Sequence, residues 1–255
     1  MKVDKVDYRY DNKIIFKALS LSIKQHAITT IIGPNGSGKS TFLQLLAGYL
    51  TPRNGAIYLD GMILKDYKKK VLAKKLSAVH QKSTAPMDFS VREVVSYGRY
   101  SYRQPFEKDV DGEAVIERVL QQLNLNQYAD TAVHALSGGE MQRVFIAMSL
   151  VQEPEVLLLD EPTTFLDLQY QYQVLDMIKE LKEKQNLTII MVLHDINQAL
   201  MYSDEIVCIE SGEIVAQGPP EKVVTQKLLK DVYHIDAKII HDQECGLLIG
   251  KFDRR

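Results

Sequence analysis

The hydrophobic positions near the start of the chain predict strands on either side of a glycine-rich loop. Apolar and polar residues alternate over residues 14–23, the period of two that is typical of short antiparallel strands. Residues 28–32 are isoleucine and threonine, β-branched residues that are typical of a buried strand. After the loop at residues 33–38, Phe42 and Leu46 recur at helical spacing, so we expect a strand, a loop and a helix in succession.

Farther along, a helical stretch interrupts an alternation of strands and helices. Residues 85–153 have helical periods and no convincing strand, after which the alternation returns. We expect the later elements in the order strand 156–159, helix 172–184, strand 188–193, helix 196–201 and strand 206–209. The pattern predicts one α/β domain over residues 1–255, with a mostly parallel sheet and its ligand site at the carboxyl ends of the strands. We expect a core of about 1–84 and 154–255, which includes an N-terminal antiparallel β subdomain, and an inserted α-helical subdomain of about 85–153.

Composition narrows the possible partners and locations. The formal net charge of -2 gives no electrostatic reason to expect nucleic acid. The longest apolar runs, at residues 156–159 and 189–193, are far shorter than the ~20 residues of a membrane-spanning helix. Because the first residues lack the apolar stretch of a secretory signal, we expect the chain in the cytoplasm. Cys208 and Cys245 lack a metal-binding pattern, so we expect reduced thiols and assign them no chemistry.

The glycine-rich loop has the spacing of a phosphate-binding motif between a predicted strand and a predicted helix. It comprises Gly33, Pro34, Asn35, Gly36, Ser37, Gly38, Lys39 and Ser40. Glycines let backbone N–H groups close around phosphate oxygens, and the start of the helix faces the same anion with its positive end. Lys39 would hold the β- and γ-phosphates of a nucleotide, and Ser40 would bind Mg²⁺. A plain glycine-rich turn with an exposed lysine is the simpler alternative, and both flanking elements argue against it.

Two adjacent carboxylates end the apolar run at residues 156–159. Asp160 and Glu161 repel each other, so this strand end needs a compensating cation. We expect Asp160 to hold Mg²⁺ through water and Glu161 to polarise an attacking water. A solvated strand end is the alternative, and the phosphate loop in the same chain makes it the weaker interpretation.

The segment LSGGEMQR at residues 136–143 narrows the choice among families of nucleotide-binding proteins. Ser137 followed by Glu140 is a capping box, which by itself indicates only a helix start. The segment also resembles the signature sequence of ABC ATPases, and other features of that family follow in its order. These features are Tyr10, the phosphate loop, Gln81, the signature, Asp160 with Glu161, Leu166 with Asp167, and His194. Taken singly, each has a more ordinary structural interpretation, and only the ordered set indicates the family.

The resemblance implies a P-loop NTPase (RecA-like) core and a set of ligand contacts. It implies ATP contacts for Tyr10, Gly33, Pro34, Asn35, Gly36, Ser37, Gly38, Lys39, Ser40, Thr41, Ser137, Gly138, Gly139 and Asp167. It implies Mg²⁺ ligands at Ser40, Gln81 and Asp160, and catalytic roles for Glu161, His194 and Gln81. Tyr10 is the expected adenine platform because it directly precedes a turn, and Tyr8 is the alternative.

The same resemblance implies partners. Each family ATP site combines the loop of one copy with the signature of another, so we expect a head-to-tail pair of chains. Two stretches, residues 88–100 and 161–167, look like the ATPases of siderophore, haem and cobalamin importers. This implies that the chain drives uptake of an iron chelate with ATP. It also implies two kinds of partner, membrane permease subunits and an extracytoplasmic binding protein, and a location at the cytoplasmic face of the membrane. Residues Ser101 and Tyr102 depart from the Pro-His of many members, which weakens the assignment of the cargo.

Three alternatives stay open at this point. The run Tyr97, Arg99, Tyr100, Tyr102 and Arg103 fits a permease-docking surface, and it also mixes aromatic and basic residues as a single-stranded nucleic-acid surface does. A soluble ABC ATPase acting on ribosomes, DNA or cluster assembly is a second possibility, and an ABC ATPase for another cargo belongs with it. A nucleotide-binding module without turnover is the third, and the presence of Glu161 and His194 argues against it.

Overall fold

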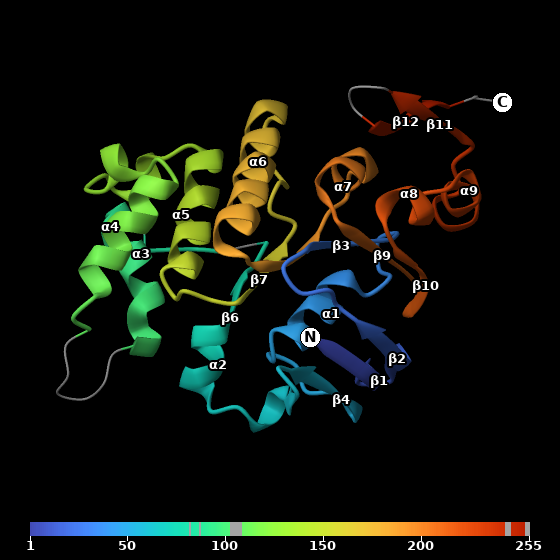
Figure 1. Cartoon of the computed structure of the whole chain (residues 1–255), viewed down its shortest axis with the longest axis horizontal. Coiled ribbons are helices and arrows are strands. Elements are labelled where there is room, and N and C mark those ends of the chain that lie inside the picture. The colour runs from blue at the N-terminus through green and yellow to red at the C-terminus, as the bar shows by residue number, and fades with distance from the viewer. Residues whose placement is uncertain (82, 87, 103–108, 243–245, 253–255) are drawn as a thin grey trace. The chain divides into compact units, whose positions relative to one another are not determined.

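The computed structural model describes residues 1–81, 83–86, 88–102, 109–242 and 246–252. The chain divides into two compact units, one of residues 1–66 with 188–255 and one of residues 67–187 (Figure 1). The first unit contains β1 (Lys2–Tyr10), β2 (Lys13–Ser22), β3 (Ile28–Ile32), α1 (Lys39–Leu46), β4 (Asn54–Leu59), β5 (Met62–Ile63), β8 (Thr188–Val192), α7 (Ile196–Tyr202), β9 (Glu205–Glu210), β10 (Glu213–Gly218), α8 (Pro220–Val223), α9 (Gln226–Tyr233), β11 (Ala237–Asp242) and β12 (Gly246–Phe252). The second contains α2 (Lys69–Lys75), β6 (Leu76–Val79), α3 (Val91–Ser96), the 3₁₀ segment η2 (Tyr97–Tyr102), α4 (Gly112–Gln122), α5 (Gly138–Leu150), β7 (Val156–Asp160) and α6 (Leu168–Gln185).

The N-terminal strands of the first unit form the predicted antiparallel sheet, in the order β2-β1-β4-β5. Val6 pairs with Leu19 across β1 and β2, and both side chains are buried. Apolar residues on one face of these strands thus reach a core while their neighbours stay exposed, which explains the period of two in the sequence.

A second group of strands in the first unit carries the expected ligand edge. β3 lies between β8 and β9 and runs parallel to both, while β10 pairs antiparallel with β9. Every residue of β3 and β8 is buried, as expected of parallel strands covered on both faces. Ile31 pairs with Val192, so the chain leaves β3 and β8 at the same edge and at the same level.

The second unit combines a parallel strand pair with helices. β6 and β7 pair in parallel, with Val79 opposite Leu159. The described residues between 85 and 153 form helices joined by turns and loops, with no strand and one isolated bridge between Ser90 and Ala132. The predicted helix 172–184 begins earlier, at Leu168, and the sequence analysis did not predict α2 or β6.

The C-terminal part of the first unit ends in a hairpin of β11 and β12. The backbone N–H of Ile249 in β12 donates a 2.7 Å hydrogen bond to Oδ1 of Asn197 in α7. This bond fastens the hairpin to α7. The sequence analysis placed no strand here.

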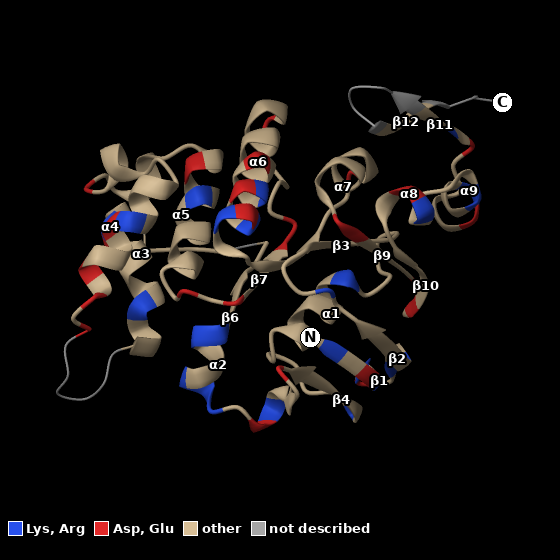
Figure 2. Cartoon of the chain, viewed as in Figure 1, with Lys and Arg blue, Asp and Glu red and all other residues tan. Residues whose placement is uncertain are grey.

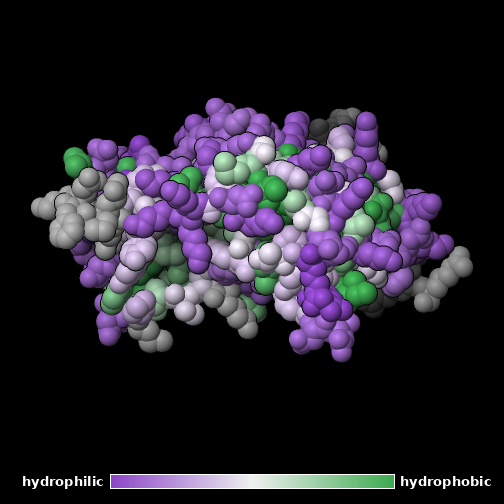
Figure 3. Space-filling view, turned by 90° about the horizontal axis from the view of Figure 1, so that it is seen from below, coloured by the Kyte–Doolittle hydropathy of each residue, from purple (hydrophilic) through white to green (hydrophobic). Residues whose placement is uncertain are grey.

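The surface is mostly polar. α2 has the sequence KKVLAKK, with four lysines and no acidic residue, and it is blue in Figure 2. The face shown in Figure 3 is largely hydrophilic, with scattered hydrophobic patches. Within the described part of the chain, no helix combines the length and apolar character needed to cross a bilayer.

Candidate functional site

The loop after β3 has a backbone that only glycine permits at its first position. Gly33 has φ +146°, and a Cβ added there would lie 2.0 Å from the carbonyl oxygen of Ile209 in β9. The Gly33 backbone also hydrogen-bonds the hydroxyl of Tyr233 at the end of α9. At the other end, Gly38 has φ +105° and a Cβ there would lie 2.8 Å from the ring of Phe16. The loop is therefore held against β2, β9 and α9 before any ligand arrives.

The polar groups of this loop are arranged for an anion. The Lys39 ammonium is buried and donates hydrogen bonds to the carbonyl oxygens of Gly33, at 2.9 Å, and Pro34, at 3.0 Å. Among the described side chains, the Ser37 hydroxyl is one of few buried polar groups without a hydrogen-bond partner. An unmet buried hydroxyl is costly, and a phosphate oxygen would satisfy it. The loop thus fits the triphosphate of a nucleotide, in agreement with the sequence pattern.

His194 follows β8 on the same sheet edge. Gly33 and His194 each stand two residues beyond the paired Ile31 and Val192, so they leave the sheet side by side. Asp195 then caps α7, because its side chain accepts hydrogen bonds from the backbone N–H groups of Asn197 and Gln198. This cap explains the exposed position of His194 at the turn before the helix.

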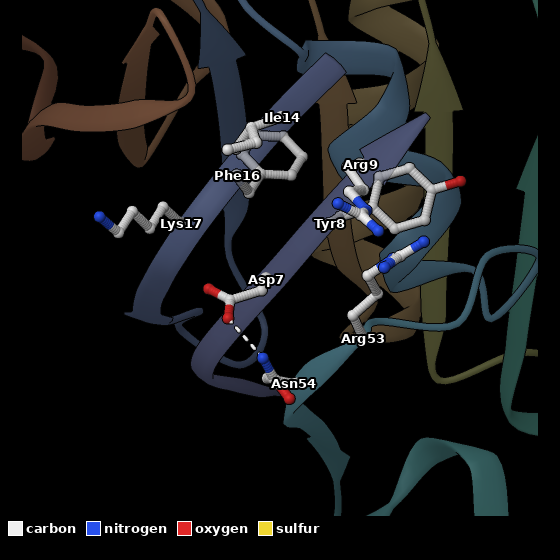
Figure 4. Close-up of a pocket in the computed structure, with 8 residues that line it drawn as sticks. All are labelled: Asp7, Tyr8, Arg9, Ile14, Phe16, Lys17, Arg53 and Asn54. Atoms are coloured by element: carbon white, nitrogen blue, oxygen red, sulfur yellow. Dashed lines mark hydrogen bonds between the residues drawn. The ribbon is translucent and has the colours of Figure 1, made fainter. Parts of the chain in front are cut away.

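A pocket of about 290 Å³ lies beside the N-terminal sheet (Figure 4). It is lined by Asp7, Tyr8, Arg9, Ile14, Phe16, Lys17, Arg53 and Asn54. Tyr10 is 43% exposed and packs edge to face against Tyr8, with ring centroids 5.1 Å apart. Since Tyr8 lines the pocket and Tyr10 touches Tyr8, the adenine platform can be formed by either ring, and the choice of Tyr10 remains a prediction.

In the second unit, the acidic strand end meets Gln81. Asp160 ends β7 and is buried, and Glu161 follows with φ +52°. Because Val79 pairs with Leu159, Gln81 and Glu161 both stand two residues beyond the paired strands. Nε2 of Gln81 donates a hydrogen bond to Oε2 of Glu161. The structure thus brings together two of the residues predicted to be catalytic.

The sequence analysis missed one contact of Glu161. The Thr164 hydroxyl donates a 3.0 Å hydrogen bond to Oε2 of Glu161, and the Thr164 backbone N–H donates to the Glu161 carbonyl oxygen at 3.2 Å. The two residues therefore form a closed turn. The only sequence signal is a hydroxyl residue three positions after a carboxylate, and such spacing is common.

The signature segment forms the predicted capping box. Ser137 caps α5, its hydroxyl accepts from the Glu140 N–H, and the Glu140 carboxylate accepts from the Ser137 N–H at 2.8 Å. Hydrogen bonds from Tyr128 and Ser137 hold the pKa of Glu140 below its usual value. A Cβ on Gly139 would lie 2.7 Å from the ring of Tyr170, so a side chain there would displace the ring. The start of the helix is therefore closed by its own capping box and leaves no room for a side chain at Gly139.

Only some side chains of the aromatic and basic run after α3 are exposed at the surface. Tyr97 and Tyr100 are exposed, and the Tyr97 ring stacks on Phe89 with centroids 5.7 Å apart. Arg99, expected as part of an exposed run, is instead buried, which corrects that expectation. It donates two hydrogen bonds to Asp109, at 2.7 and 2.8 Å. Burial follows from the pairing, because a guanidinium leaves water only where carboxylates replace its hydration. Arg103 and Cys245 lie outside the described residues.

The predicted site residues are divided between the two units. The first contains Tyr10, His194 and the loop with Thr41, and the second contains Gln81, Asp160, Glu161, Asp167 and the signature residues Ser137, Gly138 and Gly139. Asp167 is exposed at the start of α6. Each unit thus presents its own cluster of predicted residues.

Known proteins resemble the chain over most of its length. The model of the family described as "ABC transporter" matches residues 16–164. The petrobactin import ATP-binding protein of Bacillus anthracis is 41% identical over 250 residues, covering 96% of this chain and 90% of that protein. The ferric enterobactin transport ATP-binding protein of Escherichia coli (strain K12) is 38% identical, with 93% and 88% covered.

Solved structures agree with this relationship. A putative metal-chelate type ABC transporter in an inward-facing conformation has a TM-score of 0.84 at 26% identity, covering 98% of this chain and 96% of that one. A dimeric bacterial ABC transporter cassette has a TM-score of 0.74 at 29% identity, covering 86% and 98%. The expected P-loop NTPase fold is confirmed.

Proposed function

The chain belongs to the ABC transporter family, and we propose that it is the ATP-hydrolysing subunit of an importer that takes up an iron chelate. In this proposal, ATP binding and hydrolysis on the chain drive transport through membrane permease subunits. The observation that carries it is the signature segment LSGGEMQR, which forms the capped start of α5, in the same chain as the phosphate loop. The loop alone would fit many nucleotide-binding proteins, whereas the signature sequence resembles that of ABC ATPases.

The phosphate loop and an aromatic ring bind the nucleotide. The loop N–H groups, the Lys39 ammonium and the unpartnered Ser37 hydroxyl hold the phosphates, with Thr41 in the first turn of α1. Tyr10 stacks on adenine. Lys39 must exchange its hydrogen bonds to the loop carbonyls for phosphate oxygens, so the ammonium has oxygen acceptors both with and without the nucleotide.

Three oxygen donors would hold Mg²⁺. Ser40, Asp160 and Gln81 supply a hydroxyl, a carboxylate and an amide oxygen, the hard ligands that Mg²⁺ accepts. The ion would neutralise charge on the phosphates during transfer. Burial of Asp160 next to Glu161 supports a cation here, because two adjacent carboxylates repel each other.

Hydrolysis requires a base and a phosphate contact. Glu161 accepts hydrogen bonds, and its carboxylate polarises the attacking water. His194, at the edge shared with the phosphate loop, contacts the γ-phosphate. Gln81, which donates to Glu161 through its amide N–H, would bind the metal through its amide oxygen and relay the state of the permease.

A second copy of the chain completes each site. The chain has one phosphate loop and one signature, so two copies arranged head to tail form two complete sites. Ser137, Gly138 and Gly139 of one copy meet the γ-phosphate on the other, and Asp167 lies at the same junction. A helix start offers donors to an anion without a competing lysine, so ATP holds the pair together and hydrolysis weakens it. The dimeric form of a related cassette supports this arrangement.

The cargo and membrane partners follow from relatives and from the exposed aromatic surface. The relatives named above import petrobactin and ferric enterobactin, which supports an iron chelate as cargo. Tyr97 and Tyr100 form a candidate docking surface for the permease, at the cytoplasmic face of the membrane. An extracytoplasmic binding protein would deliver the cargo. In this scheme residues 1–84 and 154–255 form the ATPase core, and residues 85–153 form the helical subdomain.

Purification from membranes tests the proposal. The tagged chain should copurify with a multi-span permease, and the complex in proteoliposomes with a matched binding protein should take up a ferric siderophore only when ATP is supplied on the side of the chain. Lys39→Ala in the same complex is the control and should abolish uptake. Copurification with ribosomes and no permease would contradict the proposal.

A further inference from the structure

The turn after β7 contains a hydroxyl that reaches the carboxylate of Glu161. Thr164 Oγ1 lies 3.0 Å from Oε2 of Glu161, and the turn is closed by the backbone bond from the Thr164 N–H to the Glu161 carbonyl oxygen. Both contacts arise within four consecutive residues. The position of the Thr164 hydroxyl relative to Glu161 is therefore set by the local turn.

Gln81 donates to the same oxygen from the neighbouring strand end. The oxygen of the same amide is the proposed metal ligand, so the position of Gln81 depends on the metal as well as on Glu161. The Thr164 hydroxyl lies in the same turn as Glu161, and its reach to the carboxylate does not depend on the metal. Of these two donors, Thr164 is the one whose position is set by the turn that contains Glu161.

The backbone explains why Glu161 needs such a support. Its φ of +52° is in the left-handed region, which a residue with a Cβ adopts only when its surroundings impose it. The long Glu side chain then leaves the strand end with several rotatable bonds. A hydrogen bond at its tip restricts these bonds and aims the carboxylate at one point.

The residue type at position 164 fits this task. Threonine is branched at Cβ and therefore has few side-chain rotamers, so its hydroxyl is already directed when the turn forms. A hydroxyl donates well to an ionised carboxylate. Valine has nearly the same shape without the donor, and serine keeps the donor with more rotational freedom.

We propose that Thr164 is a positioning residue for hydrolysis, whose hydroxyl holds the Glu161 carboxylate against the attacking water. This inference rests on the proposed role of Glu161 as the group that polarises that water. It assigns to Thr164 an effect on the chemical step and none on ATP binding or on pairing of the chains.

Steady-state kinetics and ATP binding of Thr164→Val and Thr164→Ser test the proposal. Loss of a hydrogen bond to a charged group lowers kcat roughly tenfold to a hundredfold in Thr164→Val. KM, the dissociation constant for ATP and ATP-dependent pairing should stay unchanged, and Thr164→Ser should restore most of kcat. Thr51→Val, an exposed threonine after α1, is the matched control and should keep the parental kcat.

A double-mutant cycle separates positioning from a general structural effect. In the Glu161→Gln background, adding Thr164→Val should change the residual rate less than twofold, because the group that it positions has already lost its function. A parental kcat in Thr164→Val, or a full additional loss in the double variant, would overturn the inference. Failure of Thr164→Val to pair in ATP would also overturn it, and would place the hydroxyl at the pairing surface.

The proposed function fails in a different way. If Glu161→Gln itself hydrolyses ATP at the parental rate, then the role of Glu161 is wrong. If Glu161→Gln is inactive and Thr164→Val is fully active, only the role of Thr164 is wrong.

Discussion

Replacing Arg99 by methionine should destabilise the protein more than any comparable change at a surface arginine. The Arg99 side chain is 5% exposed and its partner Asp109 is 17% exposed. Its Nη1 also donates to the carbonyl oxygen of Val151, at 2.9 Å, and to Glu153, at 3.0 Å. The guanidinium thus joins the segment of Arg99 to Asp109 and to the residues after α5. Methionine would remove all of these hydrogen bonds.

The magnitude follows from the burial of the pair. Removing one partner of a buried ion pair costs about 3–5 kcal/mol, because the other charge stays buried without compensation. The four hydrogen bonds are not added separately, since contributions within one network are not additive. At about 2–4 °C per kcal/mol for a chain of this size, the melting temperature should fall by roughly 6–20 °C.

Arg92 provides the matched control. It also pairs with two carboxylates, Glu113 and Glu117, but its side chain is 32% exposed and theirs are 71% and 49% exposed. Arg92→Met should therefore cost at most about 1 kcal/mol. Urea denaturation followed by circular dichroism gives the free energy of unfolding of both variants. An equal loss in both would refute the argument from burial.

Asp109 supplies a second check on the same reasoning. Arg99→Met removes the guanidinium that offsets the charge of the mostly buried Asp109 carboxylate, so adding Asp109→Leu should recover part of the lost stability. If the double variant is less stable than Arg99→Met, the unpaired charge is not the source of the loss.

Three further predictions concern single side chains. Lys39→Ala should abolish tight ATP binding, because it removes the cation of the phosphate loop, and equilibrium binding of labelled ATP would show unchanged affinity if this is wrong. Ser137→Arg should leave ATP binding by the monomer intact and prevent ATP-driven pairing, and light scattering with and without ATP would contradict the shared site if the variant still pairs. Burial raises the pKa of the Cys208 thiol to about 12, so in a Cys245→Ser variant this thiol should stay protonated and unreactive to iodoacetamide at pH 8 until the protein is unfolded.

The elements that the sequence predicted best are the fully buried strands. β3, β7 and β8 are buried at every position, so their sequences consist mostly of aliphatic residues, with threonines in β3 and β8 and an aspartate at the end of β7. α2 was missed because the basic helix buries no side chain, so it shows no apolar face. β6 was missed because it is only four residues long and includes a serine. The sequence predicted Glu161 at the end of a strand but not the strand before Gln81, and the register of β6 with β7 brings the two residues together.

The limits of sequence reasoning are visible at Arg99 and Thr164. Arg99 stands among tyrosines in a run that indicates a surface, yet Asp109, ten residues away, draws it into the interior. A single sequence contains no signal for that pairing. The contact of Thr164 with Glu161 could not be predicted either, because it depends on a left-handed backbone that a glutamate rarely adopts.

The most direct test of the account is single-turnover ATP hydrolysis by Glu161→Gln, run beside size-exclusion chromatography in ATP. The amide keeps the shape and reach of the side chain and removes the charge that polarises water, so hydrolysis should slow by about 10²–10⁴-fold. ATP binding should survive and should not weaken, because like-charge repulsion near the triphosphate is relieved. With Mg²⁺ the variant should accumulate as a dimer with two intact nucleotides, whereas the parent returns to monomers. Hydrolysis by the variant at the parental rate would contradict the central claim and make His194 the next candidate for positioning the water.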